Sequence, residues 1–303
     1  TPPRQQYLQS NIQLIVTQRH MTIDNIAVIG AGTMGSGIVQ VLLQSGLNVL
    51  LHDADQTALT KASATVAERL RQQTAKGRLD PDACDKALAA LRTTEDFAAL
   101  AAADMVVEVV PERLDLKVEI FTRLGRTAAP DAILASNTSG LDIAALGRAA
   151  DRPDKVVGMH FFNPPPVMPL IEIVRSADTS EPTFTAIMAL AEKLGKIAIP
   201  VANSPGFAAN RILFPMINEA IYALYEGVAS AADIDRVLEL GASHPLGPLA
   251  LADFVGLDVT LDILASFEER FQNPKYRPCP LLREMVARGD LGRKSGRGFF
   301  DYS

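Results

Sequence analysis

Short apolar runs alternate with helical patterns from residue 26 to about residue 200. The apolar runs, which are rich in β-branched residues, lie at residues 26–29, 47–51, 105–110, 132–135, 156–159, 170–174 and 197–201. Helical patterns lie at residues 36–45, 57–75, 81–91, 115–124 and 182–194. Continuous apolar strands that alternate with helices are typical of a parallel sheet buried on both faces. We therefore predict an α/β domain with a doubly wound sheet over residues 21–202.

The segment between residues 52 and 104 is predicted to be a helical excursion from this sheet. About fifty residues there lack strand character. Asp80 followed by Pro81 is typical of a helix cap and a first helical residue, so we expect a second helix after that at 57–75. Five basic residues in the excursion are opposed only by Glu68, and they are Lys61, Arg69, Arg71, Lys76 and Arg78. Their charge fits either an anionic ligand or a solvated helix face.

After Val201 the strand pattern stops and only helical patterns follow. Helices are expected over residues 205–226, 231–240, 249–255, 257–271 and 280–288. Ser204 is the candidate cap of the first helix, Pro215 is expected to kink or restart it, and Gly227 and Gly241 are expected to end two helices. We predict an all-α domain over residues 203–303. Because its apolar helices bury each other only partly, we expect a homodimer that covers part of this domain.

Composition narrows the class of protein. The chain has 303 residues, 48% hydrophobic and 21% charged, which is ordinary for a globular protein of two domains. The net charge of -6 argues against nucleic acid or an anionic membrane as the main partner. No apolar run approaches the ~20 residues that a bilayer needs, and no signal-peptide pattern is present, so we expect a cytoplasmic protein. Residues 1–20 lack periodicity and precede Met21, and we interpret them as an N-terminal extension.

A glycine-rich turn follows the first predicted strand. It has the pattern G-x-G-x-x-G and consists of Gly30, Ala31, Gly32, Thr33, Met34 and Gly35. A helix follows the turn, a second strand follows the helix, and Asp53 lies eighteen residues beyond Gly35. This context is the one that a Rossmann-type dinucleotide site requires: glycines for close approach to the pyrophosphate, a helix N-terminus for its charge and an acid for the ribose. Since Asp53 would repel a 2′-phosphate, NAD is favoured over NADP.

A histidine and a glutamate lie on two apolar runs joined by a proline-rich loop. The runs at 156–159 and 170–174 predict two strands, and the four prolines between them predict a stiff turn. Glu172 is the only charge in its run and needs a compensating partner if it is buried. His160 is the candidate partner, and a carboxylate on one ring nitrogen would leave the other as a base. The alternative is a core histidine and a glutamate that points to solvent.

Polar side chains close two of the predicted strands. Ser136, Asn137, Thr138 and Ser139 follow one strand, and His160 closes the next. In doubly wound sheets ligands bind at the carboxyl ends of the strands, so we expect these groups to approach the nicotinamide together. Taken singly, Asn137 or Ser139 is more often a turn former than a catalytic group.

Six motifs together resemble one family. They are GAGTMG at 30–35, ASNTS at 135–139, HFFNP at 160–164, PGFAANR at 205–211, HPLGP at 244–248 and LGRKSGRGF at 291–299. In order and spacing they resemble the short (S)-3-hydroxyacyl-CoA dehydrogenases, and the bacterial 3-hydroxybutyryl-CoA dehydrogenases are the most similar. The resemblance runs from about Ile23 to the C-terminus. The sequence departs from the commonest pattern at Gly140, where a second serine often follows, and at Pro165.

The resemblance implies roles for individual residues. It implies that His160 is the catalytic base, that Glu172 orients it, and that Ser139 and Asn210 surround the reacting oxygen. The residues that it implies for NAD are the glycine turn (Gly30, Gly32, Thr33, Met34 and Gly35), Asp53, Glu112, Lys117 and Asn137. Lys76 is the candidate for the coenzyme A moiety of an acyl-CoA substrate, and no metal is expected.

Three alternatives to a short-chain 3-hydroxyacyl-CoA dehydrogenase remain open from the sequence. The substrate could be dicarboxylic, as in 3-hydroxyadipyl-CoA. A related dehydrogenase on the same fold could oxidise free hydroxy acids or sugar acids, although the basic excursion favours an acyl-CoA. A structural NAD-binding protein is disfavoured because the set of His160, Glu172, Ser139 and Asn210 is complete.

Overall fold

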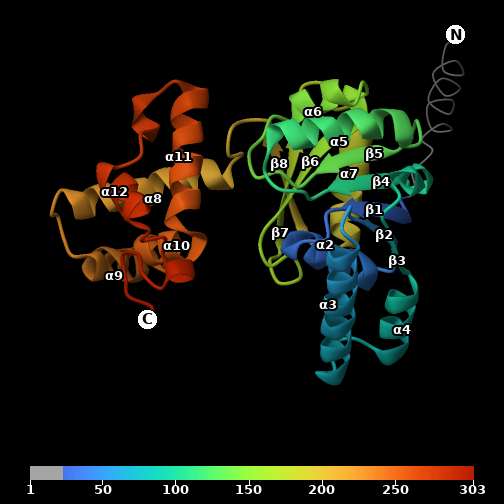
Figure 1. Cartoon of the computed structure of the whole chain (residues 1–303), viewed down its shortest axis with the longest axis horizontal. Helices are drawn as coiled ribbons and strands as arrows, with labels where there is room; N and C mark the ends of the chain where they lie inside the picture. The colour runs from blue at the N-terminus through green and yellow to red at the C-terminus, as the bar shows by residue number, and fades with distance from the viewer. Residues whose placement is uncertain (1–22) are drawn as a thin grey trace, which may run out of the picture. The chain divides into compact units, whose positions relative to one another are not determined.

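The computed structural model describes residues 23–303, which form two compact units (Figure 1). The first unit contains residues 23–138 and Ile143–Pro200, and the second contains Ser139–Asp142 and Val201–Ser303. The chain therefore leaves the first unit briefly at residue 139 before it crosses for good after residue 200. The extension predicted for residues 1–20 lies outside the described residues.

An eight-stranded sheet forms the centre of the first unit. Its order is β3-β2-β1-β4-β5-β6-β7-β8. The bounds are β1 Asn25–Ile29, β2 Asn48–His52, β3 Leu91–Thr94, β4 Met105–Glu108, β5 Ile133–Ser136, β6 Val156–Phe161, β7 Leu170–Arg175 and β8 Ile197–Ala202. The strands from β3 to β6 pair in parallel, and β7 pairs antiparallel with β6. The strand order reverses between β1 and β4, which is where ligands bind in sheets of this kind.

Helices flank this sheet. They are α2 Thr33–Gln44, α3 Gln56–Ala75, α4 Pro81–Ala89, α5 Leu114–Thr127, α6 Ile143–Ala149 and α7 Glu181–Lys193, with short 3₁₀ helices η1 Phe97–Ala102 and η2 Pro153–Lys155. Figure 1 shows α5 and α6 on one side of the sheet and α2 and α3 on the other. Asp55 and Asp80 cap α3 and α4 by accepting backbone N–H bonds, as their positions in the sequence favour. The central strands β1, β4, β5 and β6 are almost fully buried, with Val28 and Val107 at 0% and 1% exposure.

The strand β3 corrects one prediction. The helix expected over residues 81–91 ends at Ala89, and Leu91–Thr94 form an edge strand in the segment that lacked strand character. Its sequence, LRTT, is partly exposed and has no apolar run. It pairs in parallel with β2, with Arg92 opposite Leu50. Backbone bonds to a neighbouring strand define this element, and such bonds leave no mark on the local pattern.

The second unit is helical. Its helices are α8 Ala209–Tyr225, α9 Ala231–Ala242, α10 Pro248–Val255, α11 Leu257–Phe271 and α12 Pro280–Arg288, with η3 Pro274–Tyr276 and η4 Arg293–Ser295. Its core includes Phe214, Ile217, Leu249 and Leu264, each at most 3% exposed. The predicted fold class, a doubly wound sheet followed by an all-α region, is confirmed. Within residues 23–303, no helix is long and apolar enough to cross a membrane.

Three local predictions in the second unit were wrong or incomplete. Ser204 does not cap α8, which begins at Ala209, because Gly206 and Phe207 have φ of 73° and 51° and form a left-handed turn. Pro215 lies inside α8, which runs on without a restart. The helix α9 continues through Gly241 and ends before Ser243, which adopts the left-handed conformation with φ of 56°.

Candidate active site

The β6–β7 hairpin places His160 directly opposite Glu172. The two residues are register partners in the antiparallel pair, and Nδ1 of His160 lies 2.8 Å from Oε2 of Glu172. Both are buried, at 5% and 2% exposure. Because a carboxylate only accepts, it favours the tautomer with hydrogen on Nδ1 and leaves Nε2 as the nitrogen that can take a proton. The alternative of a solvent-facing Glu172 is therefore wrong.

The loop after His160 is held at both ends. The ring of Phe162 lies 4.7 Å from the His160 ring, centroid to centroid. Pro165 packs against α2, where a Cβ on Gly37 would come within 2.9 Å of Pro165 Cδ. Lys196 Nζ donates to the carbonyls of Pro165 and Met168 at 2.7 and 2.9 Å. Burial lowers the pKa of Lys196. Sequence reasoning did not find Lys196, since its partners are backbone carbonyls about thirty residues away.

The glycine turn has the shape that a dinucleotide site needs. Gly30 has φ of 111°, and a Cβ on Gly35 would lie 1.8 Å from the Gly30 carbonyl oxygen, so neither position accepts a side chain. Gly32 precedes α2 and makes no side-chain cap, and a Cβ at this position would meet nothing within 4 Å. The helix α2 begins at Thr33 and Met34, and the backbone N–H groups of a helix N-terminus suit a pyrophosphate. These residues fit NAD.

Asp53 is tied to the same turn. Its Oδ2 accepts from the backbone N–H of Ala31 at 2.8 Å, and its Oδ1 accepts from that of Asp55 at 3.1 Å. The carboxylate is thus fixed at the carboxyl end of β2, beside the glycine turn. This is the position from which an acid reaches the ribose hydroxyls of a bound dinucleotide.

Asn137 braces the strand that carries His160. Its side-chain Oδ1 accepts from the backbone N–H of Phe161 at 2.9 Å, and its own backbone N–H donates to the Glu108 carbonyl at 2.8 Å. Asn137 therefore links the ends of β4, β5 and β6, which are three neighbouring strands. Of the residues expected near the nicotinamide, Ser136, Asn137, Thr138 and His160 lie in the first unit, whereas Ser139 belongs to the second.

A buried charged cluster lies at the ends of β4 and β5. Lys117 Nζ is 2.6 Å from Oε1 of Glu108 and 3.4 Å from Oε2 of Glu112. Ser136 Oγ donates to Oε2 of Glu108 at 2.6 Å, and Thr138 Oγ1 donates to Glu112. Glu108 and Lys117 are 0% and 1% exposed. The structure thus brings together Glu112 and Lys117, which were predicted for NAD, Ser136, which was expected near the nicotinamide, and Glu108, which was not predicted. The missed signal was a glutamate inside an apolar strand, as at Glu172.

Ser139 and Asn210 lie in the second unit and contact each other. Asn210 Nδ2 donates to the Ser139 carbonyl at 3.2 Å. Arg270 donates to the carbonyl of Gly140, and Asn203 Nδ2 donates to Asp142 Oδ1 at 2.5 Å. The short loop 139–142 is therefore held by hydrogen bonds at three points.

Lys76 and the basic cluster lie on the helical excursion. Lys76 caps the C-terminal end of α3 and is exposed, as are Lys61, Arg71 and Arg78. Among the described residues, none of the five basic side chains of this cluster pairs with a carboxylate within 4.0 Å. The excursion thus carries unpaired positive charge, which suits a phosphorylated ligand.

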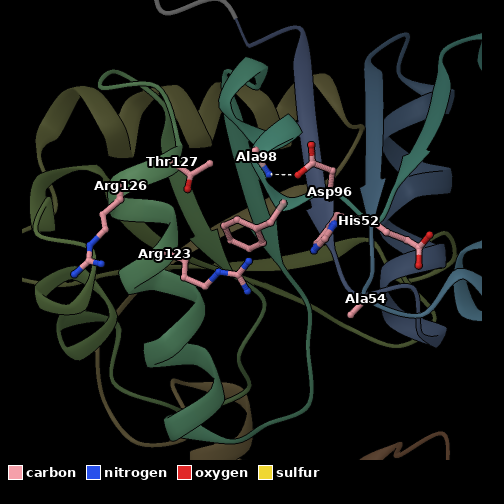
Figure 2. A pocket seen from close by; sticks show the side chains of 9 residues that line it. His52, Ala54, Asp96, Ala98, Arg123, Arg126 and Thr127 are labelled. Atoms are coloured by element: carbon pink, nitrogen blue, oxygen red, sulfur yellow. Dashed lines mark hydrogen bonds between the residues drawn. The ribbon is translucent and has the colours of Figure 1, made fainter.

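A cavity of about 530 Å³ lies beside β2, between η1 and α5 (Figure 2). Figure 2 shows Arg123 and His52 pointing toward one another across it. The guanidinium of Arg123 lies 3.9 Å from the centroid of the Phe97 ring, and His52 meets that ring edge-on at 5.4 Å. Nδ1 of His52 lies 3.0 Å from the Thr94 carbonyl, and burial lowers the pKa of His52. His52 is thus a strand residue that joins β2 to β3, and His160 does not line this cavity.

Comparison with known proteins identifies related chains. Residues 25–204 match the family model for the 3-hydroxyacyl-CoA dehydrogenase NAD-binding domain, and residues 206–302 match the one for the C-terminal domain of that enzyme. A probable 3-hydroxybutyryl-CoA dehydrogenase of Bacillus subtilis is 46% identical over 93% of this chain and 98% of its own. The mitochondrial hydroxyacyl-coenzyme A dehydrogenase of Sus scrofa is 38% identical over 97% of this chain and 96% of its own. The crystal structure of (S)-3-hydroxybutyryl-CoA dehydrogenase from Ralstonia eutropha superposes with a TM-score of 0.91 at 46% identity, covering 93% and 100% of the two chains.

Proposed function

We propose, because the chain belongs to the 3-hydroxyacyl-CoA dehydrogenase family, that its substrates are short-chain (S)-3-hydroxyacyl-CoA thioesters such as 3-hydroxybutyryl-CoA. The chain is an NAD-dependent oxidoreductase that interconverts 3-hydroxyacyl-CoA and 3-oxoacyl-CoA. The names of several relatives support the four-carbon substrate. The observation that carries the proposal is the buried His160–Glu172 pair, since the reaction requires a base and this pair would supply one.

His160 is proposed as the general base. When bound, NAD accepts the hydride that leaves C3 of the substrate. Nε2 of His160 takes the proton of the 3-hydroxyl as the C3 carbonyl forms, and the imidazolium returns that proton in the reverse reaction. Glu172 accepts from Nδ1, so it keeps the ring in the useful tautomer and stabilises the imidazolium. Positioned proton transfer of this kind contributes roughly 10² to 10⁴ in rate.

The cofactor contacts are proposed at the carboxyl ends of the central strands, where the strand order reverses. The glycine turn and the N-terminus of α2 would hold the pyrophosphate, and Asp53 would accept from the ribose hydroxyls. Glu112, Lys117 and Asn137 are proposed for the nicotinamide half. Support comes from their positions, since all three belong to the network that joins the ends of β4, β5 and β6.

Ser139, Asn210 and Lys76 are proposed for the substrate. Ser139 and Asn210 are polar groups in contact with each other, and they are proposed to donate to charge that develops on the substrate oxygen. Lys76 is proposed to meet a phosphate of coenzyme A, since it is exposed and unpaired on the excursion.

A homodimer through the second unit is also proposed. Val237, Leu240 and Phe254 are large apolar side chains of this unit, and each is at least 60% exposed. Such side chains favour association when several lie on one face. Light scattering on the purified protein would report about twice the mass of the chain, and a monomer at micromolar concentration would contradict the proposal.

Comparing acetoacetyl-CoA with acetoacetate tests the proposed function. NADH oxidation would be followed with each compound, and then with 3-oxoacyl-CoAs of four to ten carbons and with dicarboxylic ones. We expect acetoacetyl-CoA to exceed acetoacetate in kcat/KM by at least about 10²-fold, because only the thioester carries the coenzyme A phosphates. Equal rates with both, or preference for a dicarboxylic thioester, would overturn the assignment of the substrate.

A further inference from the structure

Glu108 is a buried carboxylate that the reaction itself does not use. We infer that Glu108 is a positioning residue, which holds segment 109–112 against the glycine turn and thereby sets the affinity for the dinucleotide. The inference deepens the proposed function and rests on it. The carboxylate lies at the last residue of β4, next to the point where the strand order reverses, and is 0% exposed.

Three donors from different parts of the first unit converge on this carboxylate. Its Oε1 accepts from the backbone N–H of Val110 at 2.7 Å and from Lys117 Nζ at 2.6 Å. Its Oε2 accepts from Ser136 Oγ at 2.6 Å. Glu108 thus joins its own loop, helix α5 and the end of β5. Charge-assisted bonds of this kind are shorter and roughly twice as strong as neutral ones.

The segment that Glu108 holds forms one wall of the dinucleotide turn. Val109 donates from its backbone N–H to the Ile29 carbonyl at 2.8 Å, and a Cβ on Gly30 would lie 2.8 Å from the Val109 carbonyl oxygen. The backbone of this segment and the backbone of the turn are therefore in direct contact. A displacement of the backbone at Val109 and Val110 would move the turn on which the pyrophosphate is proposed to bind.

The negative charge of Glu108 matters as well as its shape. Lys117 is 1% exposed, and its ammonium faces Glu108, Glu112 and the Val110 carbonyl, the last at 3.2 Å. A buried ammonium needs a nearby anion. Glu112 is the second, more distant carboxylate at 3.4 Å, and it also accepts from the Thr138 hydroxyl. Without the charge of Glu108, Lys117 would draw Glu112 inward and away from the ligand.

The Glu108→Gln variant tests whether the charge of Glu108 sets the affinity for NADH or whether Glu108 only supports the fold. The glutamine keeps the size and two neutral hydrogen bonds but removes the charge. We expect the dissociation constant of NADH, measured by fluorescence without substrate, to rise at least about tenfold, while kcat at saturating NADH stays within about twofold of wild type. Ser136→Ala removes one neutral partner and should raise the same constant by about two- to fivefold.

Asp104→Asn is the matched control. Asp104 precedes β4, at the amino-terminal end of the strand that Glu108 closes, and accepts from the backbone N–H groups of Asp24 and Asn25 at 3.1 and 2.8 Å. The same loss of charge there should lower the melting temperature but leave NADH binding unchanged. If Glu108→Gln fails to fold, Ser136→Ala, which keeps both buried charges and removes one donor to Glu108, takes its place with its expected two- to fivefold weakening.

Two results would overturn the inference. A folded Glu108→Gln variant that binds NADH within about twofold of wild type would make Glu108 purely structural, and so would unchanged NADH binding by Ser136→Ala. A fall in kcat of tenfold or more with unchanged NADH binding would assign it to the chemical step. NADH binding is measured without an acyl-CoA, so a wrong assignment of the substrate would not change the interpretation of this measurement.

Discussion

The two units use buried carboxylates in opposite ways. In the first unit, Glu108 and Glu172 face ionisable side chains, the ammonium of Lys117 and the imidazole of His160, at 2.6 and 2.8 Å. In the second unit, Asp235 accepts from the backbone N–H groups of Leu249 and Ala250, both at 2.8 Å. A carboxylate that faces a titratable partner can tune chemistry, whereas one that faces amides fastens a loop. The partner, more than the burial, separates the two roles.

Asp253 is the second fastening of this kind. It is 1% exposed and accepts from the backbone N–H groups of Phe299 and Phe300, both at 3.0 Å, and from the Tyr302 hydroxyl at 3.1 Å. The C-terminal segment is thereby tied to α10. A Cβ on Gly298 would lie 1.9 Å from Asp253 Oδ1, so the glycine in this motif makes room for the carboxylate. Burial raises the pKa of Asp253, and that of Asp235 likewise.

The largest expected effect comes from replacing His160, the proposed base of the buried His160–Glu172 pair in the first unit. His160→Gln should lower kcat by roughly 10² to 10⁴, because no other group is proposed to take the hydroxyl proton. NADH binding, measured by fluorescence, should stay close to that of wild type. Retention of more than about a tenth of the wild-type rate would remove the general-base role.

Removing the charge of the orienting carboxylate should have a smaller effect on rate. Glu172→Gln keeps the size and a hydrogen bond to Nδ1, but it no longer stabilises the imidazolium or imposes one tautomer. We expect kcat to fall roughly 10- to 100-fold, which is part of the full contribution of the base. Steady-state kinetics at saturating NADH measure this, and a rate equal to wild type would make Glu172 equivalent to the carboxylates of the second unit.

The corresponding change in the second unit should affect stability and leave chemistry alone. Asp253→Ala leaves two buried backbone N–H groups and one hydroxyl without their acceptor, at about 1 to 3 kcal/mol for each unsatisfied group before relaxation. We expect the free energy of unfolding in urea to fall by about 2 to 4 kcal/mol, while kcat of the folded enzyme changes by less than about twofold. A large loss of kcat with unchanged stability would contradict the division between the units.

The smallest expected effect is a pH dependence. The folded-state pKa of Asp253 is raised by burial, so the folded protein binds this proton at a higher pH than the unfolded chain. This group therefore adds stability as the pH falls from neutral through the raised pKa toward the ordinary value of 3.8. Asp253→Asn cannot take up this proton. The unfolding free energy of wild type minus that of the variant should therefore increase over that range. A decrease in this difference would mean that the carboxylate is stabilised in the fold.

Much of the fold could be predicted because its signals are local. The alternation of apolar runs with helices, the cap at Asp80 and the glycine turn each depend on a few consecutive residues. The edge strand β3 could not be predicted, since its polar residues 91–94 become a strand only beside β2. Ser204 was misassigned for a related reason: a serine before an apolar helix is a good cap only if the following residues keep helical dihedrals.

By itself, the sequence determined the class of fold, the family and the chemical types available at the site, because these follow from periodicity, motif order and side-chain identity. Two predicted strands joined by a proline-rich loop also indicated His160 and Glu172 as candidate partners. Tertiary structure decided which buried acid meets which partner. Glu108 meets Lys117 and Ser136, and Asp253 meets amides 46 and 47 residues away. The electrostatic environment of a carboxylate depends on groups from distant parts of the chain, and a local sequence pattern does not predict which of them will contact it.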